Sequence, residues 1–174
     1  MNRFLARESQ GRNANAGRSS SKPRLAWPIF VLIAAWLVLS ACGGGDAKPP
    51  DIAYGVDLCE RCGMVIDEPR FAAAIVFDDG SSRKFDDAGE MFAYRADHAA
   101  EAVRAWFVHD YTSKVWLRGE TSFYVVSKKV TSPMGTGVAA FGVRAEADAF
   151  AQGLNAKVLV FDEAQRQLAA PGKR

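Results

Sequence analysis

The densest group of metal-binding side chains in this sequence lies between Cys59 and Met64. Two thiols, Cys59 and Cys62, and the thioether of Met64 fall within six residues, and Gly63 lets the backbone turn tightly between them. Thiolate and thioether sulfurs are soft donors, which select monovalent copper over hard cations. The segment therefore predicts a Cu(I) site.

Three other uses of this cysteine pair stay open. A structural zinc site needs four closed ligands, and the chain has one cysteine pair and no histidine pair at suitable spacing. A thioredoxin-type dithiol lies where a strand meets a helix, whereas this pair precedes a predicted hairpin. A structural disulfide suits an oxidising compartment, but it would close a very short loop and add little stability.

Methionine and histidine supply the remaining candidate ligands. Met91 falls on a predicted helix, where methionine commonly fills a core. Met134 lies in a predicted loop between proline and glycine, and His109 precedes Asp110, whose carboxylate could orient the imidazole. The candidate metal ligands are Cys59, Cys62, Met64, Met91, Met134 and His109.

Two acidic pairs are interpreted as local structure. Asp79 with Gly80 predicts a hairpin turn, and Asp86 or Asp87 predicts a helix cap. Their spacing lacks the glycine and terminal glutamate of a calcium loop. The sequence also has no Ser/His/Asp arrangement, phosphate-binding glycine loop or His-Glu-x-x-His motif. We therefore expect metal transfer and not enzymatic catalysis.

The N-terminal segment is typical of a bacterial lipoprotein precursor. Basic residues precede an apolar stretch from Leu25 to Leu39, and small residues precede Cys42. We expect a signal peptide over 1–41, lipid attachment at Cys42 and a flexible tether over 42–51. The globular part would be lipid-anchored at the periplasmic face of a bacterial membrane, which we expect to be the outer membrane. An uncleaved anchor is the alternative, although the apolar run is short and contains a proline.

Removal of that leader changes the charge of the protein. The whole chain has a formal net charge of +2, but residues 1–41 hold six basic residues and one acidic residue, so the mature chain carries about −3. No basic patch survives, which argues against nucleic acid as a partner. The mature length suits one domain with a hydrophobic core.

The elements that must position the cysteines form an α+β pattern. Residues 52–165 are predicted to hold two ββαβ units packed together, followed by a C-terminal tail over 166–174. His98 is expected near the start of a helix. No strict repeat in the sequence links the two units, so the duplication is a prediction of topology. The predicted strands are 72–77, 82–85, 106–111, 123–126, 138–143 and 157–161, and the predicted helices pass through 90–94 and 145–154.

Short motifs in this order resemble the NosL family of nitrous oxide reductase accessory lipoproteins, and the resemblance spans Cys59 to Phe161. The motifs are Cys62-Gly63-Met64-Val65-Ile66, Phe71-Ala72-Ala73, Phe85-Asp86-Asp87 with Met91-Phe92, and Pro133-Met134-Gly135 with Ala140-Phe141.

The resemblance implies a membrane-anchored periplasmic copper chaperone. Such a protein binds Cu(I) and serves the maturation of nitrous oxide reductase beside an ABC-type maturation complex. The implied fold is two ββαβ units related to organomercurial lyase. The resemblance makes Cys62 and Met64 ligands, with Met91 and Met134 as weaker candidates, whereas Cys59 either binds metal or tunes its neighbour.

The mechanism that we expect is transfer of a two- or three-coordinate Cu(I), since a low coordination number leaves room for an incoming donor. The alternative is a periplasmic thiol-disulfide or general metal-resistance lipoprotein. In a third hypothesis the chain is a lipid-anchored scaffold, and its cysteines only staple a loop.

Overall fold

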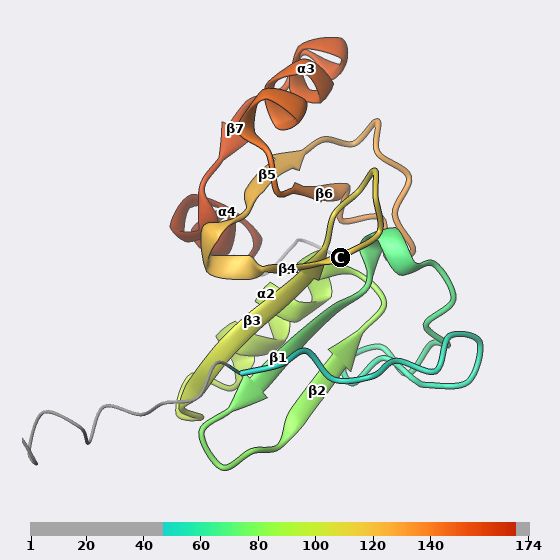
Figure 1. Ribbon diagram of the computed structural model, residues 1–174, viewed down its shortest axis with the longest axis vertical. Coiled ribbons are helices and arrows are strands. Elements are labelled where there is room, and N and C mark those ends of the chain that lie inside the picture. Colours follow the sequence, from blue (N-terminus) through green and yellow to red (C-terminus); the bar gives the residue numbers. More distant parts are fainter. Residues whose placement is uncertain (1–46, 170–174) are drawn as a thin grey trace, which may run out of the picture. The chain divides into compact units, whose positions relative to one another are not determined.

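The computed structural model describes residues 47–169, which belong to one compact unit beginning at Gly45. The expected signal peptide, the expected lipidation site Cys42 and half of the tether lie outside the described residues. Two antiparallel sheets, each associated with a helix, make up this unit (Figure 1). No helix within residues 47–169 is long and apolar enough to cross a membrane.

The first half has the ββαβ order, with an added fourth strand. Its sheet has the strand order β2-β1-β3-β4, and helix α2 packs on β1 and β2. A hairpin turn at Asp79-Gly80 joins β1 to β2, and Gly80 has a positive φ of 85° there. The elements are the 3₁₀ turn η2 (Pro69–Phe71), β1 (Ala73–Phe77), β2 (Ser82–Phe85), α2 (Ala88–Asp97), β3 (Val103–His109) and β4 (Trp116–Arg118).

The second half repeats the ββαβ order. Its sheet has the strand order β6-β5-β7, with α3 packed on β5 and β6. Helix α3 ends at Asn155, whose left-handed backbone (φ 54°) forms the cap. The elements are the 3₁₀ turn η3 (Gly119–Thr121), β5 (Phe123–Val126), β6 (Val138–Phe141), α3 (Arg144–Leu154), β7 (Val158–Leu159) and α4 (Phe161–Leu168). The predicted α+β fold of two ββαβ units is therefore confirmed.

The second sheet belongs to two hydrophobic cores because neighbouring residues of a strand face opposite sides. Tyr124 packs in the main core with α2, whereas Val125 packs in a smaller core with α3. Phe92 of α2 lies beside Tyr124, with 5.6 Å between ring centroids, and equally close to Phe161 of α4. Aromatic packing thus joins the two halves.

The C-terminal segment differs from the prediction. The expected strand over 157–161 covers only Val158–Leu159, and Phe161 begins α4, which takes three residues of the expected tail. Helix α4 is amphipathic and sets Phe161 and Ala164 against the main core. Its packing, and not a strand pattern, therefore decides the structure of this segment.

One smaller prediction was also wrong, and one strand was not predicted. His98 does not begin a helix but caps the C-terminus of α2, where its ring stacks on Tyr94 with 4.0 Å between centroids. Strand β4 was not predicted, and it pairs with the end of β3, so that Trp116 lies opposite His109.

Candidate metal centre

The two candidate thiols lie on a tight hairpin. An isolated β-bridge pairs Leu58 with Val65, and inside it the Cys59 amide donates to the Met64 carbonyl at 2.8 Å. The Gly63 amide donates to the Cys59 carbonyl at 2.9 Å, and Gly63 has a φ of 72°. A side chain at position 63 would strain this backbone, so the turn that brings the cysteines together depends on glycine.

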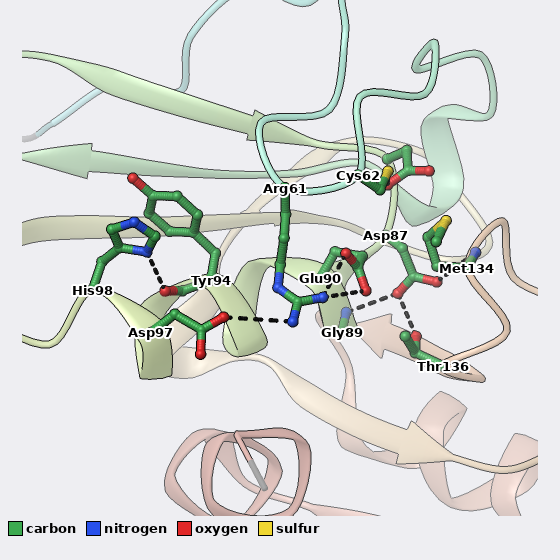
Figure 2. A network of polar contacts seen from close by, with 11 residues as sticks. Arg61, Cys62, Asp87, Gly89, Glu90, Tyr94, Asp97, His98, Met134 and Thr136 are labelled. Atoms are coloured by element: carbon green, nitrogen blue, oxygen red, sulfur yellow. Dashed lines mark hydrogen bonds and ion pairs between the residues drawn. The ribbon is translucent and has the colours of Figure 1, made fainter. Parts of the chain in front are cut away.

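The hairpin is anchored on both neighbouring elements of the first half. The Glu60 amide donates to the Lys84 carbonyl of β2 at 2.9 Å. Arg61, between the two cysteines, contacts both carboxylate oxygens of Glu90 at 3.0 and 2.9 Å, and lies 3.5 Å from Asp97 (Figure 2). Both contacts to Glu90 come from one Arg61 nitrogen, Nη1, and opposite charges strengthen them. The thiols are therefore held beside the loop between β2 and α2.

That loop contributes a carboxylate to the thiols. One ligand atom each of Cys59, Cys62 and Asp86 lies within 4.8 Å of the others. The Cys62 thiol lies 3.6 Å from Asp86 Oδ1, at the long end of a sulfur hydrogen bond. Asp86 is only 2% exposed, and its Oδ2 has no hydrogen-bond partner among the described residues. Two thiols and a carboxylate thus face a shared space.

The two thiols differ in their access to solvent. Cys59 is buried and Cys62 is half-buried, and both are free thiols. Burial raises the pKa of the Cys59 thiol to about 12, and the neighbouring Asp86 carboxylate acts in the same direction. The metal-free Cys59 is therefore a neutral thiol at physiological pH, and binding of a metal must displace its proton.

A loop of the second half reaches the same place. The buried Asp87 caps α2 by accepting from the Gly89 amide at 2.8 Å, and it also accepts from the Met134 amide at 3.3 Å. The hydroxyls of Ser132 and Thr136 donate to the same carboxylate. Figure 2 shows the Met134 sulfur on the side of Asp87 where Cys62 lies. Asp87 thereby ties the loop with the thioether to the helix that follows the metal cluster.

The other candidate methionines have contrasting environments. Met64 is 52% exposed at the mouth of the hairpin, whereas Met91 is fully buried in the main core, which also includes Cys59. Met134 is half-buried. The Met64 side chain is therefore open to solvent, whereas Met91 and Cys59 are not.

His109 is not part of the cluster of Cys59, Cys62 and Asp86. It lies at the end of β3, separated from β2 by β1. Its Nδ1 is 3.0 Å from the Ala72 carbonyl and therefore donates to it, which leaves Nε2 to accept from the Tyr54 hydroxyl at 3.1 Å. Burial lowers the pKa of this imidazole. With both nitrogens engaged, His109 holds the sheet end together in this structure.

The expected pairing of His109 with Asp110 is wrong. The Asp110 carboxylate accepts from the amides of Thr112, Ser113 and Gly142, at 3.0, 2.8 and 2.9 Å. It therefore organises the turn after β3 and the start of α3. The imidazole is oriented by a backbone carbonyl instead.

The acidic pair Asp86-Asp87 has two roles, of which the sequence predicted one. Asp87 is the helix cap, as expected. Asp86 is the site residue that the sequence analysis missed. A cap needs a single carboxylate, so the second member of the pair was the signal that could have pointed to a ligand.

Comparisons with a family model and with solved structures both give matches. A sequence model of the NosL family matches residues 54–169. Among solved structures, the chain is similar to one described as the copper chaperone NosL from Shewanella denitrificans, at a TM-score of 0.59 and 21% identity. That alignment covers 68% of this chain and 96% of the other, and it shows a shared fold. No curated protein matches the chain significantly.

Proposed function

The chain belongs to the NosL family, and from this premise we propose that it is a copper chaperone that carries Cu(I) on Cys59 and Cys62. In this proposal it is a transfer protein and not an enzyme. It works at the periplasmic face of a membrane, anchored through Cys42, and serves nitrous oxide reductase and its ABC-type maturation complex. The solved NosL structure, described as that of a copper chaperone, supports the proposed cargo.

The juxtaposition of two free thiols is the observation that carries the proposal. Cu(I) is satisfied by two soft donors, and the hairpin around Gly63 supplies them without large rearrangement. Met134, on the loop held by Asp87, and Met64, next to the hairpin turn, are candidate thioether donors. The carboxylate of Asp86 beside them is a hard oxygen donor, which Cu(I) does not require.

The gradient of burial suggests how the ion moves. Met64 is exposed and Cys62 is half-buried, so an incoming donor can reach them, whereas Cys59 is buried. A partner ligand can add to a two- or three-coordinate Cu(I) before a bond to this protein breaks. Transfer by ligand exchange avoids release of the free ion.

A thiol-disulfide oxidoreductase is less well supported. The attacking cysteine of such enzymes has a lowered pKa and is partly exposed. Here the first cysteine of the pair is buried, and its pKa is raised. A low-potential dithiol that reduces insulin, with activity lost in Cys59→Ser, would nevertheless restore this alternative.

The test is anaerobic titration of the reduced domain from residue 45 onward with Cu(I), in competition with a chromogenic chelator. We expect one tightly bound ion, which Cys62→Ser and Cys59→Ser abolish. Met64→Leu should weaken binding, whereas Ser81→Ala on the remote β1–β2 turn serves as the matched control. Unchanged stoichiometry in both cysteine variants would disprove the proposed site.

Delivery and anchoring need the full chain in cells. In a strain that makes nitrous oxide reductase, we expect Cys62→Ser to leave that enzyme deficient in copper. Cys42→Ala should move the protein from the membrane fraction to the soluble fraction. Copper-replete enzyme in the Cys62→Ser strain would assign the protein another recipient.

A further inference from the structure

The Asp86 carboxylate is not explained by a Cu(I) site. It is 98% buried, and its Oδ2 lacks a hydrogen-bond partner among residues 47–169. Burying a polar oxygen without a partner is costly, because the oxygen loses its water. Cu(I) prefers sulfur, so two thiolates do not require a hard oxygen beside them. The carboxylate therefore needs a second reason for its position.

The usual structural reasons for a buried carboxylate do not apply to Asp86. The neighbouring Asp87 already caps α2. Within the described part of the chain, no lysine, arginine or histidine forms an ion pair with Asp86. Its carboxylate lies beside the two thiols: Oδ1 is 3.6 Å from the Cys62 thiol, and one carboxylate oxygen lies within 4.8 Å of both sulfurs.

We propose that Cys59, Cys62 and Asp86 together form a site for a divalent d¹⁰ cation of the Zn²⁺ type, in competition with Cu(I). Two thiolates and one carboxylate carry three negative charges, which more than balance a doubly charged ion, and thiolate and carboxylate are both ligand types that zinc accepts. The fourth tetrahedral position remains for water or for an incoming donor. Their ligand atoms already lie within 4.8 Å of one another, so a small contraction completes the set.

Other cations fit these donors less well. Mg²⁺ and Ca²⁺ need six or more oxygen ligands, and the cluster offers one carboxylate. Two Cu²⁺ ions would each take one electron from the dithiolate, which yields one disulfide and two Cu⁺ ions. A reduced dithiol therefore does not hold Cu²⁺. Zn²⁺ is redox-inert and does not oxidise the pair.

The inference rests on the same thiols as the proposed function, but it makes a separate demand on Asp86. Cu(I) requires the two sulfurs, whereas the divalent ion also requires the carboxylate. A substitution at Asp86 therefore separates the two activities, and neither cysteine substitution can do so.

The experiment is a pair of titrations on the reduced domain, one with Zn²⁺ and one with Cu(I), each against a chromogenic chelator. We expect wild type to bind one Zn²⁺. Asp86→Asn should lose at least the ~10- to 100-fold in zinc affinity that weaker outer-shell changes cost. Its Cu(I) affinity should change by less than about threefold. Asp78→Asn, an exposed carboxylate on the β1–β2 turn, is the matched control and should leave both affinities unchanged.

A second measurement uses the wild-type protein alone, so its result does not depend on whether Asp86→Asn folds. Cd-113 NMR of the wild-type protein reports whether the bound ion has two sulfur ligands with oxygen or sulfur ligands alone. A sulfur-and-oxygen shift supports the site, and a sulfur-only shift overturns it.

The titrations have equally definite outcomes. Equal zinc affinity in wild type and Asp86→Asn, or absence of zinc binding in wild type, overturns the inference. Zinc binding that depends on Asp86 in a protein that fails to bind Cu(I) would instead reject the proposed copper function and retain this site.

Discussion

The two halves of the molecule have the same ββαβ topology, but within residues 47–169 only the first half contains a candidate metal-binding cluster. In each half the second strand ends at a phenylalanine, two residues follow, and a helix begins: Phe85 precedes α2, and Phe141 precedes α3. In the first half these two residues are Asp86 and Asp87. In the second half they are Gly142 and Val143.

This difference accounts for what each loop does. Asp87 caps α2 and accepts four hydrogen bonds, whereas Val143 provides no side-chain bond to cap α3. Where Asp86 turns toward the thiols, a Cβ on Gly142 would lie 3.0 Å from a methyl of Leu117. The second half therefore fills this place with apolar packing.

The comparison teaches that the ββαβ fold provides a position for a site but not the site itself. The hairpin that carries the thiols precedes β1 and has no described counterpart before β5, where η3 stands instead. The first half differs from the second in having Asp86 beside the dithiol and Asp87, which accepts hydrogen bonds from the Met134 loop. Exchange of single residues between them tests this conclusion.

The largest effect on stability is expected from Asp87→Val, which gives the first loop the residue of the second. Loss of the cap costs about 1–2 kcal/mol, and the hydroxyls of Ser132 and Thr136 lose their acceptor, so we expect about 3 kcal/mol in total. Urea unfolding measures this change. The reverse exchange, Val143→Asp, should stabilise α3 by about 0.5–1 kcal/mol. Similar stability of Asp87→Val and wild type would mean that the two loops are equivalent.

A pH dependence of copper affinity should belong to the first half alone. Since the pKa of Cys59 is about 12, its proton is present throughout the physiological range and leaves when metal binds. Release of this proton makes the affinity for Cu(I) rise by at least about tenfold for each pH unit. Chelator competition between pH 6 and 8 measures the slope. A flat profile would show that Cys59 remains protonated and is not a ligand.

The contact between the halves at Gly89 gives a smaller expected effect. A Cβ there would lie 2.4 to 2.6 Å from atoms of the Thr136 side chain, so Gly89→Ala must push the Met134 loop away. Overpacking costs about 1–3 kcal/mol, and the better helix propensity of alanine returns about 1 kcal/mol. We expect net destabilisation of about 1 kcal/mol.

The matched control for Gly89→Ala lies in the helix of the second half. A Cβ on Gly153 meets nothing within 4 Å, so Gly153→Ala should stabilise α3 by up to about 1 kcal/mol. Stabilisation by both substitutions would show that the Met134 loop does not press on α2.

The smallest expected effect is a loss of stability in acid caused by His109. Both histidines lie in the first half, so this effect belongs to that half. Burial lowers the pKa of folded His109 below its ordinary value, so protonation favours the unfolded chain. Its contribution is fully present above about pH 6.5 and is lost as the pH falls through the folded pKa. Urea unfolding of His109→Gln should show a shallower loss of stability below pH 6.5. Equal slopes would place the acid sensitivity elsewhere.

Much of the fold could be predicted because it depends on local patterns. The turn at Asp79-Gly80, strand β2, strand β5 and the end of α3 at Asn155 all follow from periodicity and turn residues. Strand β4 and helix α4 could not be predicted in this way. Strand β4 has three residues and α4 is a short amphipathic helix. The structure of each depends on packing against a segment that is distant in the sequence.

The candidate site likewise has a part that local sequence predicts and a part that depends on long-range packing. Cys59, Cys62 and Gly63 are close in sequence, and the family resemblance that they helped to carry is confirmed. The structure left His109 outside the cysteine cluster, where the Ala72 carbonyl and Tyr54 engage its nitrogens. The residues that contact a histidine across a sheet cannot be predicted from the residues next to it in the sequence.

The sequence by itself determined the chemistry on offer, because residue type and close spacing decide that two soft thiols can meet. Only the tertiary structure decided which groups join them. Asp86 reaches the thiols because the hairpin docks on β2 and α2, and the Met134 loop lies nearby because Asp87 accepts its hydrogen bonds. These contacts span more than twenty residues of chain, and they form only when two separate elements pack together.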